Sequence, residues 1–284
     1  MIILDIEQGS DEWKELRRNK ITATDAGIIM GLNPWTTPYQ LWQRKLGLIE
    51  EQEVNDKMRE GSLMEEEARN FFNKPRYEDF SPIVALHSEN EWAMASFDGL
   101  NGCHDILEIK CGKKSYEQAK EGIIPDYYMS QLQHQIYIAD HDRASYFCYI
   151  SRSQNVLIVV KRDDAFIEKM IEAEKKFFDC LMNFSPPPLT DRDFTVRTDP
   201  HFIEKADKYS LIKRERQRLE QEEDALRDEL IRESGGLSVK VSGLTISKSP
   251  RRGNIEYNAI PELKSIDLNK YRKKSIEVWT VRES

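Results

Sequence analysis

The chain has 284 residues, of which 39% are hydrophobic and 32% are charged, and its formal net charge is −8. This length suits one large domain or one domain with an extension. The acidic balance excludes a bulk polycation, so any contact with nucleic acid must come from local basic patches. The four cysteines form no CxxC pair, which disfavours a zinc ribbon or an iron–sulfur cluster.

Membrane and export segments are not evident in the sequence. No apolar run approaches the length of a membrane span, and the N-terminus lacks the basic-then-apolar order of a signal peptide. We therefore expect a cytoplasmic protein with reduced cysteines and no membrane partner.

The first part of the chain, residues 1–50, is expected to be helical with short breaks. Ser10 precedes two acidic residues, as at a helix start. Thr22 or Thr24 could cap a second helix, and residues 37–46 read as a third. Hydroxyl groups at a helix start with a nearby arginine can bind phosphate. An ordinary capped helix is the simpler interpretation of this pattern.

Residues 50–74 form an acidic stretch with an apolar face at helical spacing. Its run of three glutamates would ordinarily face solvent. Glu65, however, shares a face with Ala68 and Phe72, so it is the glutamate that we expect to point inward.

Two strands are predicted next, over residues 93–98 and 105–111, joined by a loop over 99–104. Side chains alternate faces along a strand. Glu108 and Lys110 therefore point the same way, and Leu107 and Ile109 point into an apolar layer. The hairpin can bring Asp98 beside Glu108 and Lys110.

The rest of the N-terminal part contains a helix that Pro125 opens, on which Gln131 and Gln135 lie one turn apart. Strands over 143–150 and 156–161 and a helix over 163–184 follow. The SPPP run at 185–188 predicts a domain boundary. We divide the chain into a domain of residues 1–190 and a C-terminal extension of residues 191–284.

The extension differs in kind from the domain. Residues 201–233 predict a long charged helix, in which Ile212, Leu219 and Leu226 recur every seven residues. This weak coiled-coil pattern suits a helical arm on the same chain or a dimer seam equally. Residues 237–284 predict a small α+β unit with a hairpin around 250–253, a helix after Pro261 and a final strand over 276–281. That unit carries ten Lys/Arg and five Asp/Glu, so it is +5 and the remainder is −13.

The carboxylates of Asp98 and Glu108, with the Ile109 carbonyl between Glu108 and Lys110, are hard oxygen ligands that suit Mg²⁺ or Mn²⁺. Lys110 could orient or deprotonate an attacking water. Glu65 could help to hold a second ion, and two metals clamp both oxygens in phosphodiester hydrolysis. A surface cluster of ion pairs is the alternative interpretation of the same residues.

The D-x9-E-x-K string in its strand–turn–strand setting resembles the core of the PD-(D/E)xK nucleases. The chain also resembles the YqaJ-type viral recombinase family, to which the phage lambda exonuclease is related. Four motifs in family order carry this resemblance: Trp13, Arg17 and residues 21–25; Gly61, Glu65, Ala68 and Arg69; Asp98, Glu108 and Lys110; and residues 128–133. Tail residues that resemble the family's C-terminal extension are Gly253, Tyr257, Tyr271, Arg272 and Trp279.

The resemblance implies an α/β restriction-endonuclease-like core, with a central mixed sheet flanked by helices. It implies a Mg²⁺-dependent 5′→3′ exonuclease that digests double-stranded DNA from its ends and leaves 3′ single strands for recombination by annealing. Asp98, Glu108, Ile109 and Glu65 would hold Mg²⁺ or Mn²⁺, with two ions as the expected number. Lys110 would position the water, and Gln131 the nucleophile or the scissile phosphate.

The resemblance also assigns Arg17 and Thr24 to the terminal 5′-phosphate. Thr24 stands where serine is frequent, and either hydroxyl can donate to phosphate. Phe97 replaces the proline of the motif name. A homotrimeric ring, a single-strand annealing partner and a phage or prophage origin in a bacterial host are further implications.

Two other functions fit the same residues. The first keeps the fold but makes the protein an endonuclease or a structure-specific nuclease. The second is a non-catalytic DNA-binding assembly protein, in which the acidic cluster is structural.

Overall fold

The computed structural model describes residues 1–49, 56–76 and 79–251, with 253, 256, 260, 261, 263 and 266. Residues 56–63 and 75–76 are described by their backbone alone. The chain divides into two compact units, Met1–Thr195 and Val196–Ser284. Each unit is described by itself.

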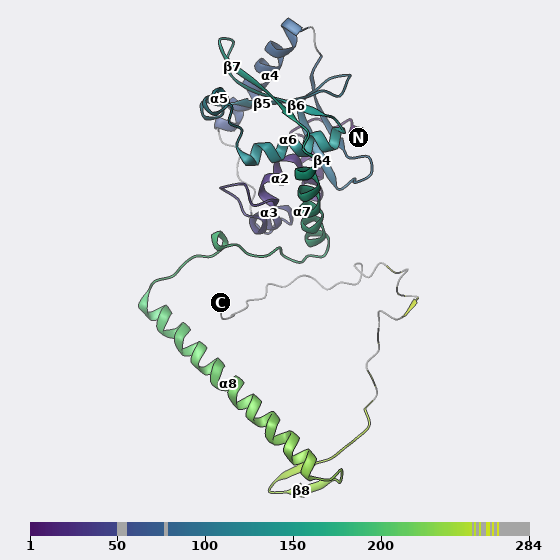
Figure 1. Cartoon of the computed structure of the whole chain (residues 1–284), viewed down its shortest axis with the longest axis vertical. Coiled ribbons are helices and arrows are strands. Elements are labelled where there is room, and N and C mark those ends of the chain that lie inside the picture. The colour runs from purple at the N-terminus through teal and green to yellow at the C-terminus, as the bar shows by residue number, and fades with distance from the viewer. Residues whose placement is uncertain are drawn as a thin grey trace. The chain divides into compact units, whose positions relative to one another are not determined.

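The N-terminal unit contains both helices and strands, as Figure 1 shows. Its strands are β1 Ile2–Leu4, β2 Ile21–Thr22, β3 Ser81–Leu86, β4 Ala93–Leu100, β5 Ile106–Cys111, β6 Arg143–Ser151 and β7 Gln154–Lys161. Its α-helices are α1 Asp11–Asn19, α2 Ala23–Ile29, α3 Pro38–Lys45, α4 Asp56–Arg76, α5 Lys113–Lys120, α6 Asp126–Ala139 and α7 Asp164–Met182. A short 3-10 helix, η1, spans Asp191–Asp193.

The strands form one mixed sheet in the order β1-β3-β4-β5-β6-β7, and β2 pairs with β4 away from this path. The β5–β6 and β2–β4 pairs are parallel, and the other pairs are antiparallel. Because parallel neighbours need a crossover connection, the chain between β5 and β6 can place α5 and α6 on one face. This mixed sheet with flanking helices confirms the predicted fold class.

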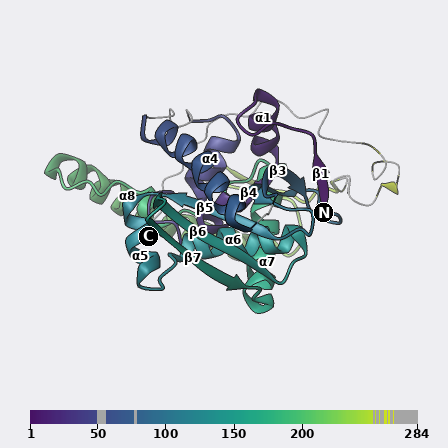
Figure 2. The ribbon, with the colours of Figure 1, turned by 90° about the horizontal axis from the view of Figure 1, so that it is seen from above.

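Each face of the sheet packs on different helices, as the view in Figure 2 shows. The larger core joins β4, β5 and β6 to α2, α5, α6 and α7, with Phe97, Ile106 and Leu132 fully buried. On the opposite face Ala68 and Phe72 of α4 pack on a second cluster of sheet residues. Helix α1 covers β3 and β4 through Trp13 and Leu16. Alternation along β5 therefore sends Glu108 toward α6, while Leu107 and Ile109 face α4.

A close approach of α2 to α6 depends on Gly27. A Cβ at this position would lie 2.9 Å from the Tyr127 Cα and 3.0 Å from the Tyr127 carbonyl oxygen. Since these are mostly backbone atoms that cannot yield cheaply, glycine is required here. The contact ties the first turn of α6 to the segment that carries Thr24.

Most of the predicted elements are present, with four corrections. Residues 2–4 and 21–22 are short strands within a region that we expected to be helical, because they pair with β3 and β4. Helix α5 was not predicted. Strand β4 runs two residues past Asp98, because Gly99 and Leu100 still pair with β5.

The C-terminal unit contains α8, Pro200–Glu233, and a hairpin of β8, Val239–Val241, and β9, Leu244–Ile246. The long helix confirms the prediction. The hairpin predicted around residues 250–253 lies partly outside the described residues, and the hairpin of β8 and β9 turns at Ser242–Gly243. Its two turn residues have positive φ angles of 46° and 81°, as a type I′ turn requires. The predicted final strand over 276–281 and Tyr257, Tyr271, Arg272 and Trp279 lie outside the described residues.

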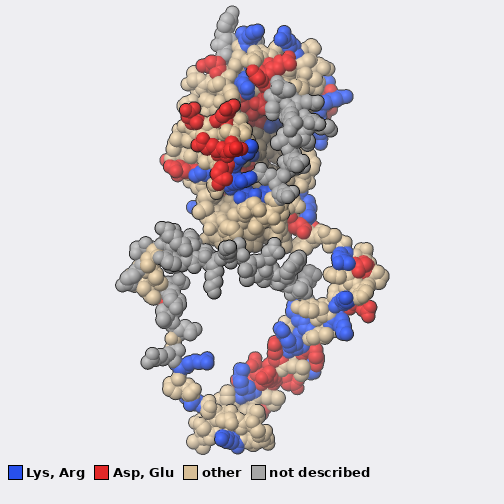
Figure 3. All heavy atoms as spheres, turned by 180° about the vertical axis from the view of Figure 1, so that it is seen from behind, with Lys and Arg blue, Asp and Glu red and all other residues tan. Residues whose placement is uncertain are grey.

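No residue of α8 is buried. The side chains of the predicted coiled-coil pattern face solvent: Ile212, Leu219 and Leu226 are 60%, 51% and 56% exposed. Acidic and basic side chains are interspersed along the helix (Figure 3), with ion pairs such as Arg216–Glu220 and Arg218–Glu215. In the described part of the chain, no helix has both the length and the apolar character to cross a membrane.

Candidate active site

The candidate site begins where β4 and β5 separate. The two strands pair only at Gly99–Leu107 and Leu100–Ile106. Beyond that point the Asp98 carboxylate takes the place of a strand partner, because its Oδ2 accepts a hydrogen bond of 2.8 Å from the Ile109 N–H. The carboxylate is thus fixed between the two strands.

Glu108 lies at the centre of a hydrogen-bond network and is only 1% exposed. Its Oε1 accepts from Lys110 Nζ at 2.5 Å and from Gln131 Nε2 at 2.6 Å. Its Oε2 accepts from Gln135 Nε2 at 2.5 Å. Both glutamines come from α6, one turn apart. The strand and the helix therefore fix the carboxylate plane together.

Lys110 is held by three neighbours. Besides Glu108, its ammonium donates to Gln131 Oε1 at 3.3 Å and lies 4.6 Å from the centre of the Tyr128 ring. An ammonium over an aromatic face is attracted by the ring quadrupole. The predicted residues Glu108, Lys110 and Gln131 are thus brought into direct contact.

Helix α4 adds Glu65 from the opposite face. Arg69, one turn further along α4, donates to the Asp98 carbonyl oxygen at 2.7 Å and to Glu65 Oε1 at 3.3 Å. Ala68 and Phe72, on the same helix, are buried against the sheet. The apolar stripe docks the helix, and Arg69 then sets the position of Glu65 next to β4.

The charges of this cluster do not cancel. Burial raises the pKa of Asp98 well above its ordinary value, and the neighbouring Glu108 and Glu65 carboxylates raise it further. Burial and Glu108 likewise raise the pKa of Glu65, although Arg69 acts against this. Burial works to lower the pKa of Lys110, but Glu108 and Asp98 outweigh it, so that pKa is raised. Lys110 therefore stays protonated among carboxylates that repel one another.

This donor set fits a divalent cation in chemistry. Carboxylate oxygens are the ligands that Mg²⁺ and Mn²⁺ prefer, and a cation would relieve the repulsion that raises the pKa of Asp98. Within the described residues, no three His, Cys, Asp or Glu side chains already converge as a finished set of ligands. The fit therefore rests on the kind of donors and on their mutual repulsion.

Replacing Asp98 with asparagine tests whether the cluster is strained. The amide keeps an acceptor for the Ile109 N–H but removes one repelling charge. At pH 8, without divalent cations, the variant should melt several degrees higher than the wild type, since about 1 kcal/mol corresponds to about 2–4 °C in a domain of this size. Differential scanning calorimetry in EDTA measures this. A lower melting temperature would favour a structural ion-pair cluster.

The N-terminal residues Arg17 and Thr24 also meet. Arg17 Nη2 donates to Thr24 Oγ1 at 3.1 Å, and its guanidinium lies 4.4 Å from the centre of the Trp13 ring. Thr24 Oγ1 is 3.0 Å from Thr22 Oγ1, and Thr22 caps α2. Thr24 is exposed, so the guanidinium and the hydroxyl form a polar pair that solvent reaches.

A buried ion pair supports this segment and was missed in the sequence. Lys45 Nζ lies 2.7 Å from Asp25 Oδ2, with side-chain exposures of 6% and 8%. Lys45 also donates to the Arg17 and Lys20 carbonyl oxygens, each at 2.8 Å. Burial tends to raise the pKa of Asp25, but Lys45 and Arg17 lower it overall. One lysine of α3 thus joins the end of α1 to the start of α2.

Two residues of the central network also received no role from the sequence. Gln135 holds the second oxygen of Glu108, and its own Oε1 is buried without a partner among the described residues. Arg69 belongs to the second motif, but its contact with a backbone carbonyl leaves no trace in a sequence. The helical spacing of Gln131 and Gln135 was the one available indication.

A second buried pair joins α6 to α7. His134 Nδ1 is 2.8 Å from Glu174 Oε1, and its Nε2 is 3.1 Å from the Met94 carbonyl oxygen. Burial works against a charged imidazole, but Glu174 outweighs it, so the pKa of His134 is raised above 6.5. Burial raises the pKa of Glu174 above 4.5, although His134 opposes it. The folded protein therefore binds more protons than the unfolded chain.

This pair predicts a pH dependence of stability. Both pKa values are raised in the folded protein. The free energy of unfolding should therefore fall as the pH rises from about 4.5 to beyond the raised pKa of His134. Glu174→Gln should flatten or reverse this trend. Urea unfolding at pH 5 and pH 8 measures the slope for both proteins. Equal slopes would show that the pair does not act as described.

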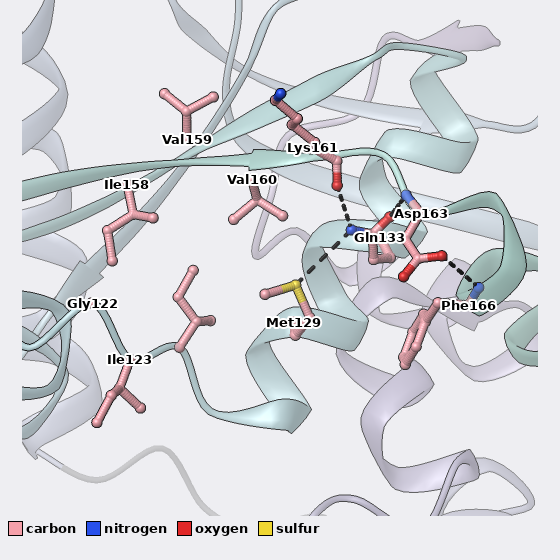
Figure 4. A pocket seen from close by; sticks show the side chains of 11 residues that line it. Gly122, Ile123, Met129, Gln133, Ile158, Val159, Val160, Lys161, Asp163 and Phe166 are labelled. Carbon is pink, nitrogen blue, oxygen red and sulfur yellow. Dashed lines mark hydrogen bonds between the residues drawn. The ribbon is translucent and has the colours of Figure 1, made fainter.

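A separate cavity of about 590 Å³ lies between α6, β7 and α7 (Figure 4). Its wall is largely apolar, with Met129 and Phe166 among the lining residues. The Gln133 amide spans it, donating to the Lys161 carbonyl oxygen at 2.8 Å and accepting from the Asp163 N–H at 3.0 Å. None of the predicted site residues lines this cavity, so it is distinct from the candidate active site.

The fold of the N-terminal unit is shared with solved exonuclease structures. It is similar to the crystal structure of an alkaline exonuclease from Laribacter hongkongensis, with a TM-score of 0.54 and 24% identity, covering 62% of this chain and 94% of that protein. The same enzyme in complex with dAMP matches with the same values.

The sequence comparison agrees with the fold. Residues 12–142 match the model of the YqaJ-like viral recombinase domain, which confirms the predicted resemblance. The chain is 30% identical over 191 residues to the uncharacterized protein YqaJ of Bacillus subtilis (strain 168). The match covers 64% of this chain and 60% of that relative's length.

Proposed function

We propose that this protein is a metal-dependent exonuclease that digests double-stranded DNA in the 5′→3′ direction and leaves 3′ single-stranded tails for recombination. The observation that carries the proposal is the contact of Glu108 with Lys110 and Gln131 beside the point where β4 and β5 separate, with the charges of Asp98 and Glu65 close enough to repel that of Glu108. Mutual repulsion among buried carboxylates is costly for stability, so such a cluster favours a functional site.

In this proposal Asp98, Glu108, the Ile109 carbonyl and Glu65 hold Mg²⁺ or Mn²⁺, with two ions as the expected number. Such ions stabilise charge on a phosphoryl group and lower the pKa of bound water. Lys110 and Gln131 position the attacking water or the scissile phosphate, since their polar atoms lie beside Glu108. The Tyr128 ring and the Glu108 carboxylate hold the Lys110 ammonium in one place.

Arg17 and Thr24 bind the terminal 5′-phosphate in this proposal. A charge-assisted hydrogen bond contributes about 1.5–3 kcal/mol, or roughly 10- to 150-fold in rate or affinity. Arg17→Ala should therefore reduce the rate ratio between 5′-phosphorylated and 5′-hydroxyl duplexes by at least about 10-fold. The ratio is insensitive to partial unfolding, because both substrates meet the same enzyme. Initial rates on the two duplexes measure it.

Arg18→Ala is the matched control, because Arg18 lies next in the chain and pairs with Glu15 at 3.8 Å. It should leave the rate ratio unchanged. An unchanged ratio in Arg17→Ala would remove Arg17 from the phosphate site.

We further propose that the protein acts in the cytoplasm of a bacterial host as a homotrimeric ring on DNA ends, beside a single-strand annealing protein. The net charge of −8 supports a role for local cations and bound metal at the DNA, so DNA binding should weaken steeply with salt. We assign the exonuclease to residues 1–190 and leave residues 191–284 as an extension.

A comparison of linear and covalently closed circular duplex DNA tests the reaction type. With Mg²⁺, the protein should degrade the linear form and leave the closed circle intact, and EDTA should stop the reaction. Cleavage of the closed circle would favour an endonuclease. DNA binding without any turnover in Mg²⁺ or Mn²⁺ would favour an assembly protein.

A further inference from the structure

Trp35 lies in the loop between α2 and α3 and is 66% exposed. No other aromatic side chain that the structure describes in the N-terminal unit is as exposed. A single exposed apolar residue is common on protein surfaces, so exposure alone assigns no role. Two further observations set Trp35 apart: its loop is fixed, and its ring connects to the candidate active site.

The loop is fixed by hydrogen bonds from several directions. Asn33 Oδ1 accepts from the Trp35 and Thr36 N–H groups, each at 2.9 Å. The Asn33 N–H donates to the Gly27 carbonyl oxygen at 2.9 Å, and Arg192 donates to the Asn33 carbonyl oxygen at 2.9 Å. The backbone that carries the exposed indole is therefore held in place, which lowers the entropic cost of binding a ligand there.

A row of aromatic rings leads from Trp35 to Lys110. The Trp35 ring meets Tyr127 edge to face, with centres 5.1 Å apart and planes at 72°. The Tyr127 and Tyr128 rings are 4.4 Å apart, and Lys110 Nζ lies 4.6 Å from the Tyr128 centre. These successive separations place the indole within about 14 Å of Lys110 Nζ.

We propose that Trp35 stacks on a base of the DNA strand that is being digested, close to the scissile phosphate. This inference rests on the proposed function. Each DNA strand advances about 3.4 Å per nucleotide, so the indole reaches a base within about four nucleotides of the cleaved bond. Stacking tolerates every base because each has a π face. An exonuclease that removes nucleotides of any sequence needs a contact of this kind.

The test uses 5′-phosphorylated duplexes with 2-aminopurine at one of the first four positions of the digested strand. Ca²⁺ replaces Mg²⁺ to allow binding without turnover. The wild type should change the 2-aminopurine fluorescence at one position, and Trp35→Ala should abolish that change. Trp35→Ala should also raise KM by at least about 5-fold with a smaller effect on kcat. Trp35→Phe should restore most of the KM effect.

Met182→Ala is the control, because Met182 is 64% exposed and lies at the end of α7. It should change neither KM nor fluorescence. Wild-type fluorescence and KM in Trp35→Ala, with digestion intact, would overturn the stacking role alone. If the wild type does not digest duplex DNA, the proposed function fails instead. A Trp35→Ala protein that loses kcat and thermal stability with KM unchanged would make Trp35 structural and also overturn the inference.

Discussion

Replacing Lys110 with methionine should reduce the rate of duplex DNA digestion by about 10²- to 10³-fold, the range for removing one group that stabilises charge in the transition state. Lys110 carries the one ammonium that contacts both Glu108 and Gln131 among the described residues, at 2.5 and 3.3 Å. Methionine keeps most of the length of the side chain and an apolar stem beside Tyr128, but it can neither donate a hydrogen bond nor carry a charge. Single-turnover rates with saturating Mg²⁺ measure the effect.

Lys120→Met is a closely matched control. Lys120 also pairs with a glutamate, Glu117 at 3.2 Å, and its ammonium lies 5.5 Å from the centre of the Tyr116 ring, but it is on the exposed face of α5. Its loss should change the rate less than twofold. If Lys110→Met folded normally and digested DNA at the wild-type rate, Lys110 would have no part in the reaction.

The largest effect on stability is expected at Lys45. Lys45→Met leaves the Asp25 carboxylate buried without its cation and leaves the Arg17 and Lys20 carbonyl oxygens without this donor. Removing one partner of a buried ion pair costs about 3–5 kcal/mol. Urea unfolding at pH 7 should show a decrease of this size in the free energy of unfolding.

The exposed pair Lys14–Asp11 provides the comparison. Its atoms are 3.0 Å apart, but the side chains are 51% and 100% exposed, so Lys14→Met should change the free energy of unfolding far less than Lys45→Met does. Asp25→Asn in the Lys45→Met background should recover part of the loss, because it removes a buried charge that has lost its ion pair with Lys45. A Lys45→Met protein as stable as Lys14→Met would show that the buried pair contributes little.

Periodicity predicted the parts of the site that lie on one element. Alternation along β5 placed Glu108 and Lys110 on one face and Leu107 and Ile109 on the other, and the structure has the same division. Helical spacing predicted that Glu65 lies on the same face of its helix as Ala68 and Phe72. These patterns are local, so a single sequence contains them.

Contacts between distant segments could not be predicted in this way. Gln135 and Ser96 meet across α6 and β4, and Arg69 reaches the Asp98 carbonyl oxygen. Each contact depends on how two elements pack. In each, the acceptor is a backbone carbonyl oxygen, a group that every residue carries. The short strand β1 was also missed, since three apolar residues form a strand only because β3 offers them an edge.

The family resemblance supplied what periodicity could not. Arg17 and Thr24 are seven residues apart across a helix end and a short strand, and no local pattern predicts that they touch. The structure brings them to 3.1 Å. The buried pair of Asp25 and Lys45, which fixes their backbone, is a feature of packing that neither the periodicity nor the motifs indicated.

The most direct test of the central claim is digestion of a linear 5′-phosphorylated duplex that is labelled separately at the 5′ and 3′ ends of one strand, in Mg²⁺ and in EDTA. The account predicts early release of the 5′ label as a mononucleotide, late release of the 3′ label, and no release of either label in EDTA. Early release of the 3′ label, or digestion that persists in EDTA, would contradict it.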